Sequence, residues 1–539
     1  MRTNIIITGI VLFTGLLSCS DSFLDVAPAD QLSDATFWQS EQDITMALNA
    51  CYRGWETATN VVFLDASSDN GFVQFVIQYE LLGSGRLLPT SNVGLGGTSW
   101  ADVYSFSTKW FSYDRIRKYN NFLEKVESIE IDASLKERYK AEVRFLRAYD
   151  YYNKVMFYGD IPLVDKVITS GAEAALSRTP RTEVADFVLK ELTEAANILP
   201  VQNTIESGGH VTKGAALALK ARFELYLGKY EEAQADAATV MAMPCYELFP
   251  TYEEMFWVSA ESSNKEAILD VQYVKNDYRQ MIPQMNLPAT EGGWSTLNAL
   301  WPFIEAFQTA DGKYIDEAGS GYNPDEPFKN RDPRLTQIVL CPGEFYNGRY
   351  YNPLDLFLDG QSDRRNLDYH EEAAASHGGL LVKKHIFPMS VVDANNYDGN
   401  GIVIRLAEMY ITFAECALKT GKDQDKALAY INAIRKRAGM PEATELTERL
   451  VRYERRIELA FEGLRYFDLK RWDLGPTLLN GWALGCRNGT MDSQTGKVTW
   501  GEGHILLEER IFQPQRNYLH PIPQAEMDRN PNMTQNPGY

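Results

Sequence analysis

The sequence of 539 residues lacks most of the features that would identify a protein at once. Its six cysteines are scattered and form no CxxC pair, which argues against a zinc site or a dense disulfide framework. Basic residues number 53 against 73 acidic ones, and this net charge of −20 argues against broad binding to nucleic acid. The hydrophobic share of 45% excludes a disordered chain. These totals exclude classes without naming a function.

Catalytic motifs are also missing. His370-Glu371-Glu372 begins like a zinc-protease motif, but the next histidine is His377, beyond the required spacing. Gly94-Leu95-Gly96-Gly97 lacks the strand, helix and lysine of a phosphate-binding loop, and no GxSxG motif occurs. With 73 acidic residues, the sequence does not exclude a pair of carboxylates at the separation that a glycosidase needs. An enzyme therefore has no positive support in these motifs, and we predict no catalytic residues.

The amino terminus has the pattern of an export signal. Arg2 precedes an apolar run from Ile5 to Leu17, which is shorter than the ~20 residues that span a bilayer. The run ends in Leu16-Leu17-Ser18-Cys19, which resembles a bacterial lipobox, although Leu17 is bulkier than usual. We predict a signal peptide over residues 1–18 and a covalent lipid on Cys19. The alternative is a chance cysteine in an ordinary signal peptide.

Helical patterns dominate residues 30–249 and return after residue 402. The helix predicted over 142–158 stops at Gly159, with Pro162 just beyond. Two further units read as helix, Gly-Lys turn and helix, and each second helix carries an alanine near its start. Such pairs resemble tetratricopeptide units. The two units cover residues 214–227 with 230–241, and 406–418 with 426–437.

Residues 250–401 break the helical pattern with glycine, proline and short β-like runs such as 267–274. We predict one domain over residues 19–539, mostly α-helical: an irregular tetratricopeptide-like scaffold (30–249 and 402–539) with an inserted loop-rich lobe (250–401) containing short strands. The proline-rich tail 514–539 is predicted to be extended and to lie against the body. In the lobe, residues 393–400 resemble a calcium loop, with a plain Asx turn as the alternative.

Several blocks occur together in a characteristic order, and together they resemble the SusD/RagB family of outer-membrane nutrient-binding lipoproteins. The resemblance covers essentially the whole mature chain. The blocks are Phe23-Leu24-Asp25, Arg144-Phe145-Leu146-Arg147-Ala148, Tyr158-Gly159-Asp160-Ile161-Pro162-Leu163, Arg331-Asp332-Pro333-Arg334-Leu335, Glu454-Arg455-Arg456-Ile457-Glu458-Leu459-Ala460-Phe461-Glu462, Leu464-Arg465-Tyr466-Phe467-Asp468-Leu469-Lys470-Arg471-Trp472, Tyr518-Leu519-His520-Pro521-Ile522-Pro523 and Asn530-Pro531-Asn532-Met533-Thr534-Gln535-Asn536-Pro537-Gly538-Tyr539.

The resemblance implies a scaffold of irregular tetratricopeptide-like helix pairs and a role without catalysis. It implies a surface lipoprotein of the outer membrane, facing the outside, where Asp21 and Asp25 look like an export signal beside Cys19. Its partner would be a SusC-like TonB-dependent transporter, on which it acts as a lid, and its ligand an oligosaccharide. The alternatives are a peptide-binding member of the family, a surface glycosidase and a purely structural repeat protein. No cofactor is expected beyond the lipid.

Two sets of charged residues have helical spacing on otherwise apolar segments. Arg405, Glu408 and Glu415 form one polar stripe, and Arg455 and Glu458 begin another. A ligand-binding cluster is one interpretation. We favour a salt-bridged seam between packed helices, because charges at such spacing pair readily.

Sugar recognition needs aromatic planes and polar groups on loops. Trp100 follows a glycine-rich stretch, and Trp294 follows Gly292-Gly293, so each either contacts ligand or anchors its loop. Trp301 begins an apolar run and reads as core or ligand contact. Asp69-Asn70 either supplies polar contacts or forms an Asx turn. The predicted ligand-binding residues are Trp100, Trp294, Tyr278, Trp301, Asp69, Asn70 and Arg86.

Overall fold

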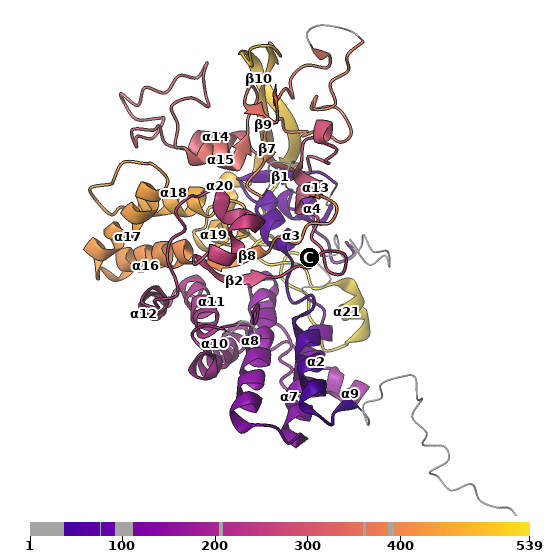
Figure 1. Ribbon diagram of the computed structural model, residues 1–539. Coiled ribbons are helices and arrows are strands. Elements are labelled where there is room, and N and C mark those ends of the chain that lie inside the picture. The colour runs from indigo at the N-terminus through magenta and orange to yellow at the C-terminus, as the bar shows by residue number, and fades with distance from the viewer. Residues whose placement is uncertain (1–36, 76, 92–110, 204–207, 359–362, 386–392) are drawn as a thin grey trace, which may run out of the picture.

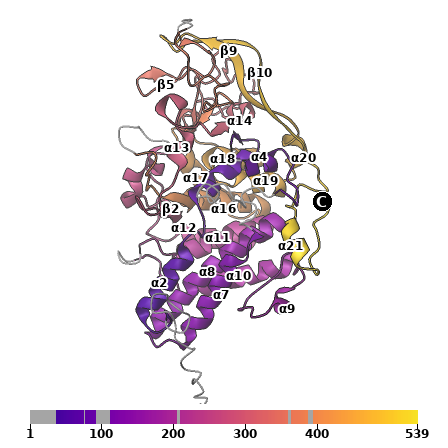
Figure 2. The ribbon, with the colours of Figure 1, turned by 90° about the vertical axis from the view of Figure 1, so that its right-hand side faces the viewer.

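A computed structural model describes residues 37–75, 77–91, 111–203, 208–358, 363–385 and 393–539 (Figure 1). Helices pack side by side in sequence order through the lower half of the molecule, and the lobe lies above them (Figures 1 and 2). No helix among the described residues is long and apolar enough to cross a bilayer. The main helices are α2 (Glu41–Tyr52), α7 (Asp114–Lys125), α8 (Ala133–Tyr158), α10 (Arg181–Ile198), α11 (Lys213–Tyr226), α12 (Tyr230–Met241), α16 (Leu406–Thr420), α17 (Gln424–Arg437) and α18 (Glu448–Glu458).

The local signals that predicted these helices act as expected. Thr212 caps α11 by accepting a hydrogen bond from the Ala215 N–H. Gly159 ends α8 at φ 72°, a left-handed value that favours glycine. Ala233 and Ala427 are fully buried where helices of each pair meet. The mostly α-helical, tetratricopeptide-like scaffold is thereby confirmed, although α8 begins before the predicted residue 142.

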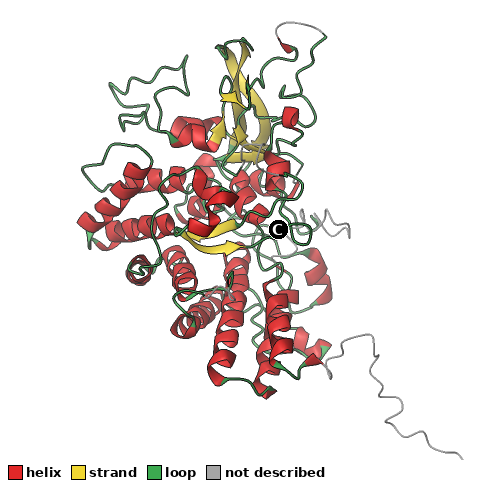
Figure 3. Cartoon of the chain, in the orientation of Figure 1, coloured by secondary structure: helices red, strands yellow, loops and turns green. Residues whose placement is uncertain are grey.

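The lobe leaves and rejoins the scaffold through one antiparallel pair, β2 (Ala267–Val271) with β8 (Gly401–Arg405), and β8 runs directly into α16. Its centre is a four-stranded antiparallel sheet in the order β1-β3-β7-β4 (Figure 3). The short strands are β1 (Gly71–Val73), β3 (Leu297–Ala299), β4 (Val339–Leu340), β5 (Phe345–Tyr346), β6 (Arg349–Tyr350) and β7 (Leu381–Val382).

Short helices occur in both the scaffold and the lobe. They are α3 (Ala58–Phe63), α4 (Ile77–Gly83), α9 (Gly171–Ala174), α13 (Ile282–Asn286), α14 (Trp301–Ala306), α15 (Arg334–Ile338), α19 (Arg465–Arg471), α20 (Gly475–Leu478) and α21 (Gln524–Arg529).

Two segments outside residues 250–401 join this lobe. β1 comes from the amino-terminal part and pairs with β3. A long hairpin, β9 (Gly481–Met491) with β10 (Val498–Arg510), interrupts the region predicted as helical scaffold and rises at the top of Figure 1. Its strands bury Ala483 against Phe72 and Leu300. Both segments take these positions through tertiary packing, which the hydrophobic periodicity of a single segment does not indicate.

The carboxyl-terminal tail lies against the scaffold, as predicted, but it is not wholly extended. Residues 524–529 form α21. Pro523 precedes this helix, a position where the missing N–H of proline costs no intrahelical hydrogen bond. The tail is tied to the end of α8: the His520 N–H donates to the Phe157 carbonyl at 2.7 Å, and the Asn536 amide donates to the Tyr158 carbonyl at 3.0 Å.

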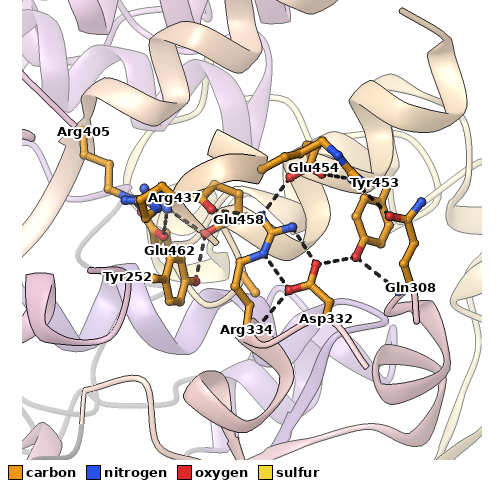
Figure 4. Close-up of polar contacts among 12 residues, drawn as sticks. Tyr252, Gln308, Asp332, Arg334, Arg405, Arg437, Tyr453, Glu454, Glu458 and Glu462 are labelled. Carbon is orange, nitrogen blue, oxygen red and sulfur yellow. Dashed lines mark hydrogen bonds and ion pairs between the residues drawn. The ribbon is translucent and has the colours of Figure 1, made fainter. Parts of the chain in front are cut away.

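A buried charged seam joins the lobe to the scaffold (Figure 4). Arg334, from the lobe, contacts Asp332 at 2.7 Å and two carboxylates of α18, Glu454 at 2.8 Å and Glu458 at 3.0 Å. Arg405 contacts Glu458 at 2.7 Å. Burial would raise the pKa of Glu458, but the neighbouring arginines hold that pKa well below its usual range. The charges therefore stay ionised and paired in the interior.

The polar stripe predicted on α16 belongs to this seam and its surroundings. Arg405 also contacts Glu462 at 2.7 Å, and Glu408 contacts Arg222 at 2.6 Å. Glu415 contacts Arg471 at the other end of the stripe. The salt-bridged interpretation is confirmed, and these family blocks hold the fold together.

Candidate ligand-binding site

One end of the central sheet presents an exposed aromatic side chain on a strained backbone. β1 ends at Val73, and Phe75 follows with φ 67° and 54% of its surface exposed. A left-handed conformation costs a bulky L-residue about 1–2 kcal/mol. Exposure of a large apolar ring adds a second unfavourable feature. Such a combination is typical of functional positions, where strain places a side chain.

The neighbouring residue, Gln74, ties three distant segments together at this point. Its amide nitrogen donates to the carbonyls of Trp294 at 3.3 Å and Ala375 at 2.7 Å. Its amide oxygen accepts from the His377 N–H at 3.1 Å. Gln74 is only 4% exposed. One buried side chain thus fixes the loop after β1, the loop before β3 and the loop before β7.

The loop before β3 requires its glycines. Gly292 has φ 81°, and a Cβ on Gly293 would lie 2.1 Å from the Leu287 carbonyl oxygen. The Trp294 N–H donates to the Gln284 carbonyl at 3.1 Å, and Ser295 has φ 46°. The Gly-Gly-Trp sequence therefore forms a tight turn that places Trp294 partly buried at the protein surface.

Histidines complete the aromatic surface. The rings of Phe75 and His377 lie 6.0 Å apart in an edge-to-face arrangement, and those of Tyr369 and His370 lie 4.7 Å apart. Burial lowers the pKa of His377, and burial also lowers the pKa of His370, where the Glu371 carboxylate opposes the shift. Both rings are therefore neutral at pH 7, where each offers one hydrogen-bond donor and one acceptor. We call Phe75, Trp294, His370 and His377 the aromatic face.

A polar clamp supports this face. The Thr290 hydroxyl donates to Asp368 at 2.7 Å, and Arg349 contacts Asp368 at 2.8 Å and Glu291 at 3.3 Å. Arg349 belongs to the β5–β6 hairpin, whose Phe345 is 62% exposed. The clamp holds the Trp294 loop against the segment that carries Tyr369 and His370, and its two carboxylates are already paired.

Asp69 and Asn70, predicted as ligand contacts, lie in the interior. Arg465 donates to Asp69 at 2.7 Å and 2.9 Å, and Arg456 donates to the Asn70 side chain at 2.9 Å. Burial would raise the pKa of Asp69, but Arg456 and Arg465 lower it well below its usual range. These side chains bind the loop before β1 to α18 and α19, so we withdraw them as ligand contacts.

The other predicted residues do not gather at one place. Trp301 begins α14, is 3% exposed and donates to Glu305 at 2.9 Å, so it is a core residue and we withdraw it too. Tyr278 stacks on Tyr273 at 5.2 Å. Arg86 donates to the Glu509 carbonyl at 3.3 Å beside β10. Trp294 alone of the described candidates lies at the aromatic face. Trp100 and Cys19 lie outside the described residues.

Sequence reasoning missed Gln74, Phe75 and the histidines of the face. The only signal for His370 and His377 was the incomplete zinc motif. Its spacing argued against a metal site, but it did not exclude that the two histidines lie close together. Among the described residues, no group of three or more His, Cys, Asp or Glu side chains is arranged to hold a metal ion. At the possible calcium loop, Asp393 accepts from the Asn395 N–H at 3.1 Å, as in an Asx turn.

A cavity of about 580 Å³ lies elsewhere, between α7, α9 and α21. Its lining mixes apolar residues such as Ile116 with charged ones such as Asp114 and Arg529. Its phenylalanine, Phe111, is 2% exposed and presents no open plane. At the aromatic face, by contrast, Phe75 is 54% exposed and offers its ring to a ligand.

Comparison with known proteins identifies the family of this chain. The SusD family model matches residues 258–539, and a second model, described as starch-binding associating with outer membrane, matches residues 22–225. The chain belongs to the SusD family.

Relatives align over nearly the full length. SusD-like protein P2 of Formosa agariphila is 26% identical over 99% of both chains. The starch-binding protein SusD of Bacteroides thetaiotaomicron is 25% identical over 98% of this chain and 97% of its own. The crystal structure of a SusD-like carbohydrate-binding protein of Bacteroides fragilis has a TM-score of 0.79 and 28% identity, over 93% of this chain and 100% of that one.

Proposed function

We propose that this protein binds oligosaccharides at the aromatic face and passes them to a SusC-like TonB-dependent transporter of the outer membrane, on which it acts as a lid. It does so from the extracellular side, as a lipoprotein attached through Cys19 after removal of residues 1–18. Relatives named for starch or carbohydrate binding support this proposal, as does the outer-membrane description of a matching family model.

The observation that carries the proposal is Phe75, exposed on a left-handed backbone beside His377, with the neighbouring Gln74 tied to the Trp294 loop. An aromatic plane stacks on the C–H face of a sugar ring, and neutral imidazoles exchange hydrogen bonds with hydroxyls. A neutral surface suits uncharged glycans in an acidic protein. Trp100 stays part of the proposed site.

The same geometry supports binding without catalysis. Two carboxylates next to the face, Glu291 and Asp368, are engaged by Arg349, and a third, Glu371, lies beside His370 and Tyr369. Glycoside hydrolysis needs one carboxyl group to donate a proton and a second to act as nucleophile or base, and paired carboxylates do this poorly. We propose no resident cofactor beyond the lipid.

The test is a glycan and peptide binding screen with the purified chain from residue 19, followed by calorimetry. We expect an oligosaccharide ligand, and Trp294→Ala is expected to weaken its binding by about 1–3 kcal/mol, the scale of a lost aromatic anchor. Trp482→Ala, at an exposed tryptophan on β9, is the matched control and should bind as wild type does.

Three outcomes would contradict the proposal. Binding of peptides with no glycan bound would identify a peptide-binding member. Release of reducing sugar by the pure protein would identify a glycosidase. Equal affinity in wild type and Trp294→Ala would place the ligand elsewhere on the molecule.

A further inference from the structure

Two buried amide side chains, Gln74 and Asn298, lie behind the aromatic face. Gln74 follows β1, and Asn298 lies in β3 of the same sheet, opposite Phe72 in the register (Figure 3). Phe72 and Gln74 are two residues apart, and paired residues share a face, so both amides lie on one side of the sheet. Asn298 is fully buried, and Gln74 is 4% exposed. The hydrogen bonds of both amides are therefore shielded from water.

The nitrogen of Asn298 holds the loop that carries Trp294. It donates to the carbonyl of Ser295 at 3.1 Å and to the carbonyl of Thr296 at 3.2 Å, in the residues directly after Trp294. Gln74 donates to the carbonyl of Trp294 itself at 3.3 Å. Consecutive backbone carbonyls of this loop thus accept hydrogen bonds from two side chains of the sheet.

The oxygen of Asn298 holds the loop that carries His377. It accepts from the Gly378 N–H at 2.8 Å and from the Ser376 hydroxyl, on either side of His377. A Cβ on Gly378 would lie 3.2 Å from the same oxygen, so this close approach favours glycine. The His377 N–H itself donates to Gln74. Each amide therefore joins the Trp294 loop to the His377 loop, from a different strand.

A primary amide is well suited to this task. It carries two donor hydrogens and an acceptor oxygen in one plane, so it can hold a carbonyl of one loop and an N–H of another at a fixed separation. Buried backbone groups of a loop need such partners, because no strand pairs with them. An apolar side chain of the same size would fill the space but would fix neither loop.

The arrangement matters for binding because a ligand that must first order its site loses affinity. Fixing loose loops and side chains costs conformational entropy, and that cost is subtracted from the contacts that the ligand makes. Here the hydrogen bonds of Gln74 and Asn298 hold the loops in the free protein. The entropy is then lost on folding and not on binding.

We propose that Gln74 and Asn298 are positioning residues of the ligand site, an inference that rests on the proposed function. They hold Trp294 and His377 at the spacing that an oligosaccharide meets, and Gln74 also fixes the start of the Phe75 turn. Neither amide touches the ligand. Loss of either amide weakens binding although every residue in contact with the sugar is still present.

The first measurement is hydrogen–deuterium exchange of the free, purified chain from residue 19. Gln74→Met removes the hydrogen bonds to Trp294, Ala375 and His377 and nearly keeps the side-chain volume. Exchange in peptides covering 290–297 and 374–381 is expected to become about tenfold faster, because these loops open locally. Exchange in the scaffold helices should stay at the wild-type rate.

Gln234→Met is the matched control. Gln234 is 7% exposed, and its amide also joins two segments, because it donates to the Lys422 carbonyl at 3.4 Å and accepts from the Thr420 hydroxyl at 3.0 Å. These contacts link α12 to the turn after α16, in the scaffold. The control should lower the thermal midpoint about as much as Gln74→Met does, with no change in the two loops.

The second measurement is a double-mutant cycle by calorimetry, with the oligosaccharide that binds wild type most tightly in the glycan screen. Gln74→Met is expected to weaken its binding about tenfold, and Gln234→Met should bind as wild type does. Trp294→Ala should cost about threefold less affinity, or less still, in the Gln74→Met background, because Trp294 is no longer held in place there. A role in stability alone predicts the same factor in both backgrounds.

Asn298→Asp tests the second amide and serves if Gln74→Met does not fold. It keeps an oxygen for Gly378 and Ser376 but loses the donors to Ser295 and Thr296. Faster exchange is therefore expected in peptide 290–297 and not in peptide 374–381, together with weaker binding of the same oligosaccharide.

The outcomes separate this inference from the proposed function. Faster loop exchange, weaker binding and a reduced cost of Trp294→Ala support the positioning role. Wild-type affinity in both Gln74→Met and Asn298→Asp, or an equal cost of Trp294→Ala in the two backgrounds, overturns the inference alone. A wild type that binds no oligosaccharide contradicts the proposed function, and the inference then fails with it.

Discussion

The charged seam lies between the lobe and the scaffold, the aromatic face lies on the lobe, and the two differ in what surrounds their side chains. Arg334 and Glu458 are fully buried and mutually paired. Phe75 is half exposed and sits on a strained backbone. Two of the family blocks, residues 331–335 and 454–462, supply Arg334 and the carboxylates of the seam, whereas the residues proposed to bind ligand lie on loops outside the blocks. Recognisable motifs therefore report the scaffold more than the ligand.

The physical reason lies in desolvation. A buried charge without its partner costs several kcal/mol, so a seam of this kind tolerates little change. Replacing an exposed loop side chain costs little of the free energy of folding, so ligand preference can vary at such loops without loss of the fold. Three experiments sharpen this contrast.

Arg334→Ala is expected to have the largest effect. It leaves Asp332, Glu454 and Glu458 without their shared cation in the interior, so we expect a loss of about 3–5 kcal/mol in the free energy of unfolding. Urea denaturation measures it. Glycan affinity of the folded fraction should be unchanged.

The matched control is Lys422→Ala, which removes an exposed ion pair with Glu231. Such pairs contribute about 0–1 kcal/mol, so the variant should unfold close to wild type. Equal losses in the two variants would mean that burial does not set the strength of the seam.

Asp65→Asn tests a buried carboxyl ahead of β1, which accepts hydrogen bonds from the Phe461 N–H at 2.6 Å and the Asn70 amide at 3.4 Å. Burial raises the pKa of Asp65 to about 7. A raised carboxyl pKa contributes stability below its unfolded value of 3.8, and this contribution is lost as pH rises to about 7. Between pH 5 and pH 7.5 the wild type should lose about 2 kcal/mol relative to Asp65→Asn.

The measurement is the unfolding free energy of both proteins across this pH range. Above about pH 7.5 the difference should stay constant, because Asp65 is then ionised in both folded and unfolded states. A difference that does not depend on pH would show that Asp65 keeps one ionisation state throughout.

Phe75→Gly separates binding from stability, with the smallest expected effect. It removes the exposed ring, so glycan affinity should fall by about 1 kcal/mol, roughly fivefold in Kd. It also relieves the left-handed strain, which offsets the entropy that glycine adds to the unfolded chain. The thermal midpoint should therefore not fall.

Phe75→Ala is the control, because alanine removes the ring but keeps the positive φ. Its affinity loss should match that of Phe75→Gly, with a lower thermal midpoint. If Phe75→Gly is the less stable of the two, the strain assigned to this position is absent.

Much of the helical scaffold was predictable because its signals are local. The Gly-Lys turns, the glycine that ends α8 and the buried alanines act within a few residues of themselves. The β9–β10 hairpin was missed, since its inward residues are recognisable only against Phe72 and Leu300. The turn that carries Trp294 was predictable from its glycines, whereas the burial of Asp69 and Trp301 depends on distant partners, Arg465 and Trp500, that neither neighbourhood in the sequence indicates.

The sequence by itself determined the family, the helix pairs and the inserted position of the lobe. Helix caps, hydrophobic periodicity and ordered motifs depend only on residues that are neighbours along the chain. Only the tertiary structure decided which polar residues became interior pairs and which loops met. Gln74, Trp294 and His377 are far apart along the chain, and the hydrogen bonds of one buried amide bring them together. Contacts of this kind depend on strand pairing across the sheet, which no local pattern records.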